Sequence, residues 1–249
     1  MVDTHCHVLS EYYNNIEELI ISIKNAGVSK IIVNGTDMKS NKEVLEIIKK
    51  YDIVYGAIGF QPTELSNYKD EDIKWLEEHI NDDKIVAIGE IGLDYHYDDT
   101  DKQLQQKVFK KQLELASFYN KPVIVHSRDS IQDTYDMISN YNLMGSIHCF
   151  SGSVEMAREF IKIGFYLGIG GVVTYKNAKN LINVINDIPL EYILLETDSP
   201  YLTPEPFRGG DNSPEFIPII VKKIAEIKGI NEKKVEEITT DNANRLFDF

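Results

Sequence analysis

Four of the chain's six histidines and two of its carboxylates lie at the ends of short apolar runs, in a pattern that suits metal binding. These residues are His5, His7, Glu90, His126, His148 and Asp198. Imidazole nitrogens and carboxylate oxygens are common protein ligands of divalent metals. Burying that many polar groups without partners would cost roughly 1–3 kcal/mol for each group. A bound metal removes that cost, so the pattern predicts a metal centre.

The grouping of the histidines predicts two metal ions. Side chains two residues apart in a strand face the same way, so His5 and His7 form one chelating pair, and the other two histidines form a second. Glu90 can bridge the two sites, and Asp198 can complete one of them. One mononuclear site with spare histidines is the alternative. The ligand set is compatible with Mg²⁺, Mn²⁺, Zn²⁺, Ni²⁺ or Co²⁺, so the identity of the ions stays open.

These residues need a scaffold that brings the ends of distant strands together. Short runs rich in Ile and Val predict strands at residues 2–7, 30–34, 53–59, 84–90, 122–126, 145–150, 165–170 and 192–198. Amphipathic segments between them predict helices at residues 16–26, 41–50, 70–80, 102–119, 130–141, 154–163, 177–188 and 214–228. A last short helix is expected at residues 232–239.

The alternation predicts an α/β protein with a single (β/α)₈ barrel. Continuous apolar strands are typical of a parallel sheet covered by helices. Eight units of about 31 residues fill the chain, so residues 1–249 are expected to form one domain. In such barrels the catalytic residues come from the C-terminal ends of the strands. An open doubly wound sheet is the alternative, but no strand is followed by G-x-G-x-x-G or a P-loop.

Composition excludes several classes of protein. The chain has 26 Lys and Arg against 40 Asp and Glu, a net charge of −14, so a broad basic surface for nucleic acid is excluded. Its two cysteines, Cys6 and Cys149, exclude a disulfide framework, and strand alternation turns both toward the helices. Without a long apolar run or a signal peptide, we expect a cytoplasmic protein with no membrane contact. No obligate protein partner is evident.

In order and spacing, the motifs resemble those of the TatD family of metal-dependent hydrolases, which are deoxyribonuclease-like members of the amidohydrolase-type barrels. The matching segments are DTHCH at 3–7, GEIGLDY at 89–95, HSRD at 126–129, HCFSG at 148–152 and ETDSPYL at 196–202. The resemblance implies a divalent-metal centre with the six residues above as ligands. It also implies hydrolysis of phosphodiester bonds, typically from a DNA strand end. The expected partners are DNA strand ends, single-stranded DNA or a small phosphodiester, because an acidic exterior around a small cationic mouth suits these better than a long duplex.

Two positions bear on the subtype. The family usually has Gly-x-His-Pro after the third strand, with the His near the substrate phosphate, whereas this chain has Gln61 there. Gln donates a hydrogen bond but carries no positive charge, which weakens a direct role on phosphate. A related class of barrels bridges its metals with a carbamylated Lys. Here Glu90 holds that position, and Lys84 lies at the opposite end of the strand.

The mechanism expected from these residues is attack by a metal-bound hydroxide. Glu90 and Asp198 are the catalytic carboxylates, with Asp198 as the general base. Arg128 is placed to clamp a phosphate, and Tyr201 and Arg208 lie in the loop after the last strand. The alternatives are a metal-dependent ester or amide hydrolase, such as an aminoacyl-tRNA deacylase, and a binding module without catalysis.

Overall fold

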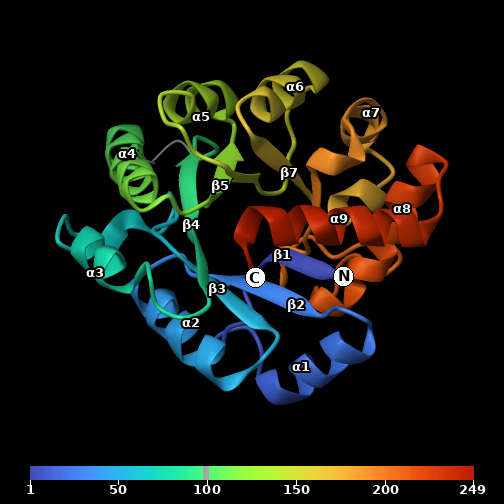
Figure 1. Cartoon of the computed structure of the whole chain (residues 1–249), viewed down its shortest axis with the longest axis horizontal. Coiled ribbons are helices and arrows are strands. Elements are labelled where there is room, and N and C mark those ends of the chain that lie inside the picture. Colours follow the sequence, from blue (N-terminus) through green and yellow to red (C-terminus); the bar gives the residue numbers. More distant parts are fainter. Residues whose placement is uncertain (98–100) are drawn as a thin grey trace.

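The computed structural model describes residues 1–97 and 101–249. Within these residues, eight parallel strands form one sheet in sequence order, and helices surround it (Figure 1). A doubly wound sheet would reverse the strand order partway, so the predicted (β/α)₈ barrel is confirmed. The strands are β1 (Val2–Cys6), β2 (Lys30–Asn34), β3 (Val54–Ile58), β4 (Ile85–Asp94), β5 (Val123–Arg128), β6 (Gly145–Ile147), β7 (Phe165–Ile169) and β8 (Ile193–Leu195).

Some helices begin at a side chain that accepts a free backbone N–H, and one ends at a glycine. Asp37 accepts the backbone N–H of Ser40 at 2.8 Å at the start of α2, and Gly229, with φ of 63°, ends α8 in the left-handed conformation. The main helices are α1 (Ile16–Asn25), α2 (Met38–Lys50), α3 (Asp72–His79), α4 (Lys102–Tyr119), α5 (Ile131–Ile138), α6 (Val154–Lys162), α7 (Lys179–Asp187), α8 (Ile217–Lys228) and α9 (Glu232–Phe247).

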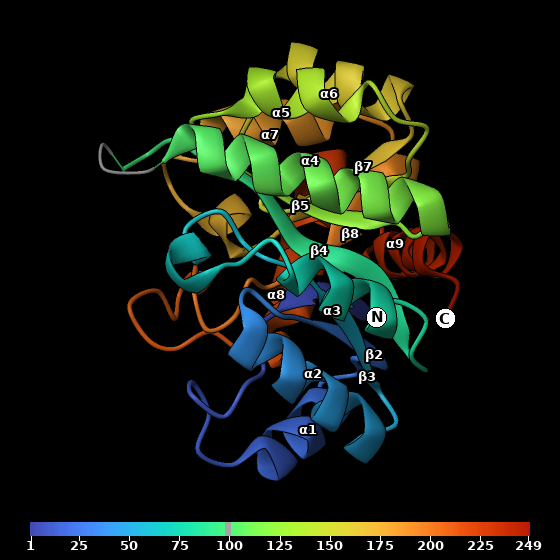
Figure 2. The same cartoon turned by 90° about the vertical axis from the view of Figure 1, so that its left-hand side faces the viewer.

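Two apolar clusters stabilise the barrel. The larger one fills the space between the strands and the surrounding helices. The smaller one lies inside the barrel, where strand residues such as Ile32 and Ile124 pack against Ala243, Leu246 and Phe247 of α9. Figure 2 shows α9 and both chain termini at the same end of the barrel. The last helix therefore closes the N-terminal end of the strands and leaves the C-terminal end for the polar residues.

The first and last strands meet at a seam. The N–H of Asp198 donates to the carbonyl of His5 at 2.9 Å, and the N–H of His7 donates to the carbonyl of Ser199 at 2.7 Å. On the same seam, the Thr4 hydroxyl donates to the carbonyl of Leu195 at 3.0 Å. The hydrogen bonds that close the barrel thus run through the backbone of three residues that we predicted to bind metal.

Strand ends differ from the prediction where the backbone turns into the site. β6 stops at Ile147 and β8 at Leu195, because Cys149 and Asp198 take left-handed φ values of 46° and 54° that an extended strand excludes. β4 instead runs on to Asp94 and pairs with Arg128, after a register shift between Ile88 and Ile91.

The last helix also differs from the prediction. We expected it to end at residue 239, but α9 continues to Phe247. In the described part of the chain, no helix combines the length and apolar character that crossing a membrane requires.

Candidate metal centre

The four histidines meet as two pairs at the C-terminal end of the barrel. The Nε2 atoms of His5 and His7 lie 3.2 Å apart, and Nδ1 of His126 lies 3.2 Å from Nε2 of His148. Imidazole nitrogens whose lone pairs converge repel one another unless a proton or a cation lies among them. Each pair therefore has the form of a chelating site.

Glu90 divides its two oxygens between the histidine pairs. Its Oε2 lies 3.5 Å from Nε2 of both His5 and His7, while its Oε1 lies 2.9 Å from Nδ1 of His126 and 3.1 Å from Nε2 of His148. Glu90 is buried near the mouth end of β4. A carboxylate in this position has the geometry of a bridge between two cations.

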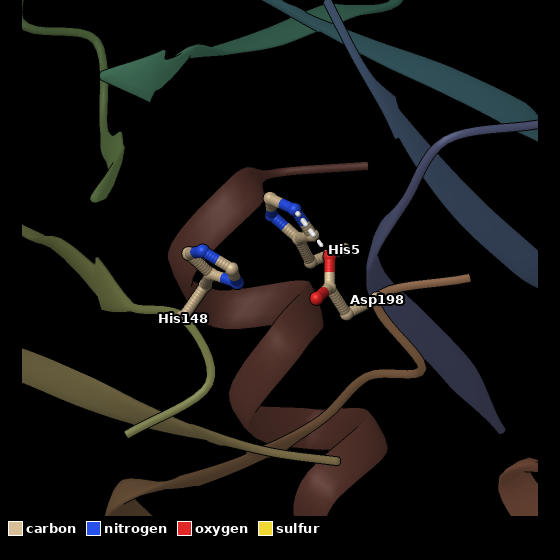
Figure 3. A group of neighbouring side chains, drawn as sticks. All are labelled: His5, His148 and Asp198. Carbon is tan, nitrogen blue, oxygen red and sulfur yellow. Dashed lines mark ion pairs between the residues drawn. The ribbon is translucent and has the colours of Figure 1, made fainter. Parts of the chain in front are cut away.

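Asp198 completes the first pair from the other side of the seam. Its Oδ1 lies 3.5 Å from Nε2 of both His5 and His7. Figure 3 shows the carboxylate directed at His5, with the His148 ring beside it. The His5 and His148 rings are stacked, with centroids 3.9 Å apart and planes 11° apart. That stacking brings the two histidine pairs into one cluster.

The residues fit divalent cations. Three overlapping groups have ligand atoms that all lie within 4.8 Å of one another. They are His5–His148–Asp198, His5–His7–Glu90 and Glu90–His126–His148. The donors are nitrogen and oxygen only, a set that suits Mn²⁺, Zn²⁺, Ni²⁺ or Co²⁺. The six side chains predicted from the sequence thus lie in one site, and Glu90 belongs to two of the three groups.

The electrostatics of the cluster favour positive charge. Burial alone would raise the pKa of both carboxylates, but the facing histidines, His148 foremost for Glu90, hold the pKa of Glu90 and that of Asp198 well below the usual values. Burial would lower the histidine pKa values, yet the carboxylates raise those of His7, His126 and His148. The cluster therefore attracts protons at the positions where cations would bind.

Two further carboxylates, which are not among the predicted ligands, stand behind the second histidine pair. Asp94 Oδ2 lies 2.9 Å from Nε2 of His126, and Glu196 Oε1 lies 3.8 Å from Nδ1 of His148. Glu196 also accepts the backbone N–H of Cys149, and its Oε2 and the Nδ1 of His148 have no hydrogen-bond partner. Such carboxylates orient a ligating histidine and raise its basicity.

The position of Asp94 and Glu196 along the chain could have predicted their role. Glu196 precedes Asp198 by two residues and Asp94 follows Glu90 by four, so each shares a strand end with a predicted ligand. A side chain on Gly168 would collide with Glu196. The glycine therefore makes room for this carboxylate between β7 and β8.

Asp3 fixes the seam beneath the first pair. Its buried carboxylate accepts the N–H of His5 at 3.2 Å, and the N–H and hydroxyl of Thr197 at 3.1 and 2.6 Å. Burial, opposed by these hydrogen bonds, raises the pKa of Asp3 to about 8. This residue thus joins β1 to the segment after β8, on either side of two candidate ligands.

Two cavities open from the cluster, and three of the four predicted substrate-binding residues line them. Arg128 and Tyr201 line both, and Gln61 lines the one on the side of His7. Gln61 Oε1 accepts two hydrogen bonds from Thr63, which leaves its amide nitrogen as the group to present to a ligand. The fourth, Arg208, is not among the described residues that line either cavity. Its guanidinium carbon lies over the Tyr175 ring, 4.1 Å from the ring centroid.

The remaining sequence predictions have mixed outcomes. Lys84 lies at the far end of β4 and donates to three backbone carbonyls there, so it does not serve the site. Cys6 is buried, as the alternation of side chains along a strand predicts, and its thiol donates to the carbonyl of Ile32. Cys149 differs, because its left-handed backbone breaks the alternation and the residue lines a cavity beside the cluster.

Known proteins are similar to this chain along nearly its whole length. The TatD related DNase family model matches residues 2–248. YabD of Bacillus subtilis (strain 168), an uncharacterized metal-dependent hydrolase, is 42% identical over 251 residues, covering 99% of this chain and 98% of that protein. The crystal structure of YjjV, a TatD homolog from Escherichia coli K12, superposes with a TM-score of 0.95 at 32% identity, covering 100% of this chain and 98% of that one. A TatD family hydrolase from Entamoeba histolytica gives a TM-score of 0.85 at 25% identity, with 99% and 97% covered. The chain belongs to the TatD related DNase family.

Proposed function

We propose that this protein is a metal-dependent hydrolase that cleaves phosphodiester bonds, with a DNA strand end, single-stranded DNA or a small phosphodiester as substrate. The observation that carries the proposal is the division of Glu90 between the two histidine pairs, at 2.9–3.1 Å from one pair and 3.5 Å from the other. This geometry supports two divalent cations over one. The family to which the chain belongs supports DNA as the substrate.

The chemistry that two divalent cations supply in such sites is polarisation of the phosphoryl group and a lowered pKa for the attacking water. In this chain the first ion would be held by His5, His7 and Asp198, the second by His126 and His148, and Glu90 would serve both. Asp94 and Glu196 would hold the second histidine pair in its ligating orientation.

Two side chains act on the substrate in this proposal. Asp198 can accept the proton that the attacking water loses, because its carboxylate lies 3.5 Å from both histidines of the first pair, beside the position of one ion. Arg128 lines both cavities beside the cluster, where its guanidinium can donate two hydrogen bonds to one phosphate. Gln61 can add one neutral hydrogen bond from the opposite side.

The first test removes one proton acceptor and one ligand separately. Asp198→Asn and His126→Ala should each lower hydrolysis of end-labelled single-stranded DNA at least about 100-fold. The first removes the general base, which contributes that much, and the second removes a ligand of one ion. The assay uses purified protein with Mn²⁺, and circular dichroism checks that each variant stays folded. RNA and an aminoacyl ester are included as substrates.

Matched controls lie just outside the cluster. Asp129→Asn changes an Asp with a φ of 53°, close to the 54° of Asp198, and His96→Ala changes an exposed histidine that pairs with Asp129 at 2.9 Å. Both controls should keep wild-type hydrolysis. Full activity in Asp198→Asn or His126→Ala, or in the wild type with EDTA, would overturn the mechanism. Turnover of the acyl ester without turnover of DNA would replace the nuclease with an ester hydrolase.

A further inference from the structure

The two cavities that flank the cluster differ in chemical character. One, of about 520 Å³, extends from the cluster past the ends of β6, β7 and β8. The other, of about 360 Å³, lies over β2 to β4. Both are bounded by His126, His148 and Asp198, so the reacting bond would lie between them. The character of each cavity then decides which part of a substrate it can take.

The larger cavity has mainly apolar walls drawn from separate elements. Phe150 follows β6, Val172 lies in a short helix after β7 (Gly171–Thr174), Leu181 lies on α7, and Leu202 follows β8. Asn180 adds a polar edge: its amide nitrogen donates to the carbonyl of Gly152 at 2.8 Å, which leaves the amide oxygen as an acceptor. Apolar walls with one polar edge suit a flat heteroaromatic ring.

The smaller cavity has the opposite character. Its lining includes Thr36, Thr63, Glu64 and Asp94 together with Glu90. Four carboxylates, those of Glu64, Glu90, Asp94 and Asp198, line this cavity against one arginine, Arg128, so this side carries an excess of negative groups. A second phosphate would be repelled there, and an apolar ring would gain little.

We propose that the larger cavity seats the base of the terminal nucleotide, while the ester lies on the metal cluster. This inference deepens the proposed function and rests on it for the position of the ester. A cavity of about 520 Å³ falls within the usual range for a small-molecule site. One nucleoside fills a space of that kind, which makes the enzyme one that acts at strand ends. Arg128 and Tyr201, which line both cavities, would then lie beside the phosphate.

The experiment measures binding without requiring turnover. Deoxyadenosine 5′-monophosphate, deoxyadenosine 3′-monophosphate and the two matching deoxyribose phosphates are titrated into Mn²⁺-loaded protein by calorimetry. At least one nucleotide should bind about tenfold more tightly than its sugar phosphate, because stacking a base contributes a factor of roughly 5–150. Equal binding of nucleotide and sugar phosphate for both isomers overturns the inference.

Variants assign the effect to one cavity. Val172→Trp and Ala178→Leu each add bulk to the apolar walls from a different element, and each should abolish most of the tenfold preference while the sugar phosphate binds as before. Thr63→Trp adds similar bulk to the opposite cavity and should keep the preference. A preference that survives both wall variants in folded protein, or that is lost only in Thr63→Trp, places the base elsewhere and overturns the inference.

The two proposals fail in different ways. Base-dependent binding without hydrolysis of DNA would leave the cavity assignment intact and refute the nuclease. Hydrolysis of DNA at equal rates from a normal terminus and from a terminus without a base would keep the nuclease and refute the cavity assignment. The cavity assignment is thus tested by comparing ligands or DNA termini with and without a base. The nuclease proposal is tested separately by the Asp198→Asn variant.

Discussion

Glu196 shows how a single carboxylate outside the predicted ligand set can decide the strength of a metal site. It is 1% exposed, and its Oε1 lies 3.8 Å from Nδ1 of His148, a nitrogen that has no hydrogen-bond partner. A small rotation of the His148 ring would join the two atoms in a hydrogen bond. That hydrogen bond would fix the opposite nitrogen of the ring, Nε2, toward Glu90.

Glu196→Gln should therefore weaken metal binding by about 10–100-fold, because the amide cannot supply the negative charge that raises the basicity of His148. A direct titration with Zn²⁺ or Mn²⁺, followed by calorimetry, measures the change. Glu191→Gln, an exposed glutamate on the same segment of chain, is the matched control. Unchanged affinity in Glu196→Gln would show that His148 needs no partner behind it.

The titrating groups predict opposite pH trends for the two forms of the protein. His7, His126 and His148 have raised pKa values, so their protonation stabilises the metal-free fold below about pH 6.5, and this stability is lost as the pH rises through the folded-state values. Asp3, raised to about 8, acts in the same direction because its neutral form is favoured in the fold. Glu90, Asp94 and Asp198 have lowered pKa values, so they lose their contribution to stability only at much lower pH.

Metal-free protein should consequently unfold at a higher urea concentration at pH 5.5 than at pH 8.5. Metal-loaded protein should show the reverse order, because protons compete with the cations for the same nitrogens. Urea titrations with EDTA and with Mn²⁺ measure both trends. The same pH order in both forms would mean that the cluster does not exchange protons for metal.

At the level of elements, the sequence predicted most strands and helices but not every end. β2 matches its predicted bounds because its apolar run stays in extended backbone up to its last residue. β6 and β8 stop early because Cys149 and Asp198 take left-handed conformations, and the propensity of an apolar run does not report such turns. Asp94 was missed as a partner of His126 for a related reason, since its position depends on a register shift between β4 and β5.

The end of α9 was missed for a different physical reason. Residues 240–247 pack into the barrel and not onto its outer layer, so their apolar residues do not follow the pattern that the other helices share. Local amphipathic patterning predicts which residues are buried, but it does not say against which layer they pack.

Phe247→Ala should destabilise the protein by about 3–5 kcal/mol, because Phe247 is 3% exposed within the cluster that fills the barrel end. Phe118→Ala, at a site that is 76% exposed, removes the same atoms from α4 and should change stability by less than about 0.5 kcal/mol. Thermal and urea unfolding of the two variants provide the comparison. Similar losses in both would show that α9 does not close the barrel.

On the scale of the whole molecule, the net charge of −14 opposes binding of a long polyanion. The cluster can reverse this locally, because two divalent cations bring more positive charge than Glu90 and Asp198 bring negative charge. The charge thus fits an enzyme that admits one strand end at a small cationic mouth better than one that grips a long duplex.

The protein should bind a long DNA duplex weakly without metal, with a dissociation constant above about 100 μM at physiological salt, the weak end of non-specific binding. Fluorescence anisotropy with labelled duplex, in EDTA and in Mn²⁺, measures this. Tight binding in EDTA would reveal a basic surface that the composition does not predict.

The seam of the barrel has a consequence for synthesis of the protein. Since His5 and His7 come from the first strand and Asp198 from the segment after the last, a nascent chain holds an incomplete cluster until roughly four-fifths of it has left the ribosome. Aborted or proteolysed fragments that lack either end of the seam cannot assemble the first histidine pair with its aspartate. The complete set of candidate ligands therefore exists only once both ends of the barrel seam have been synthesised and have met.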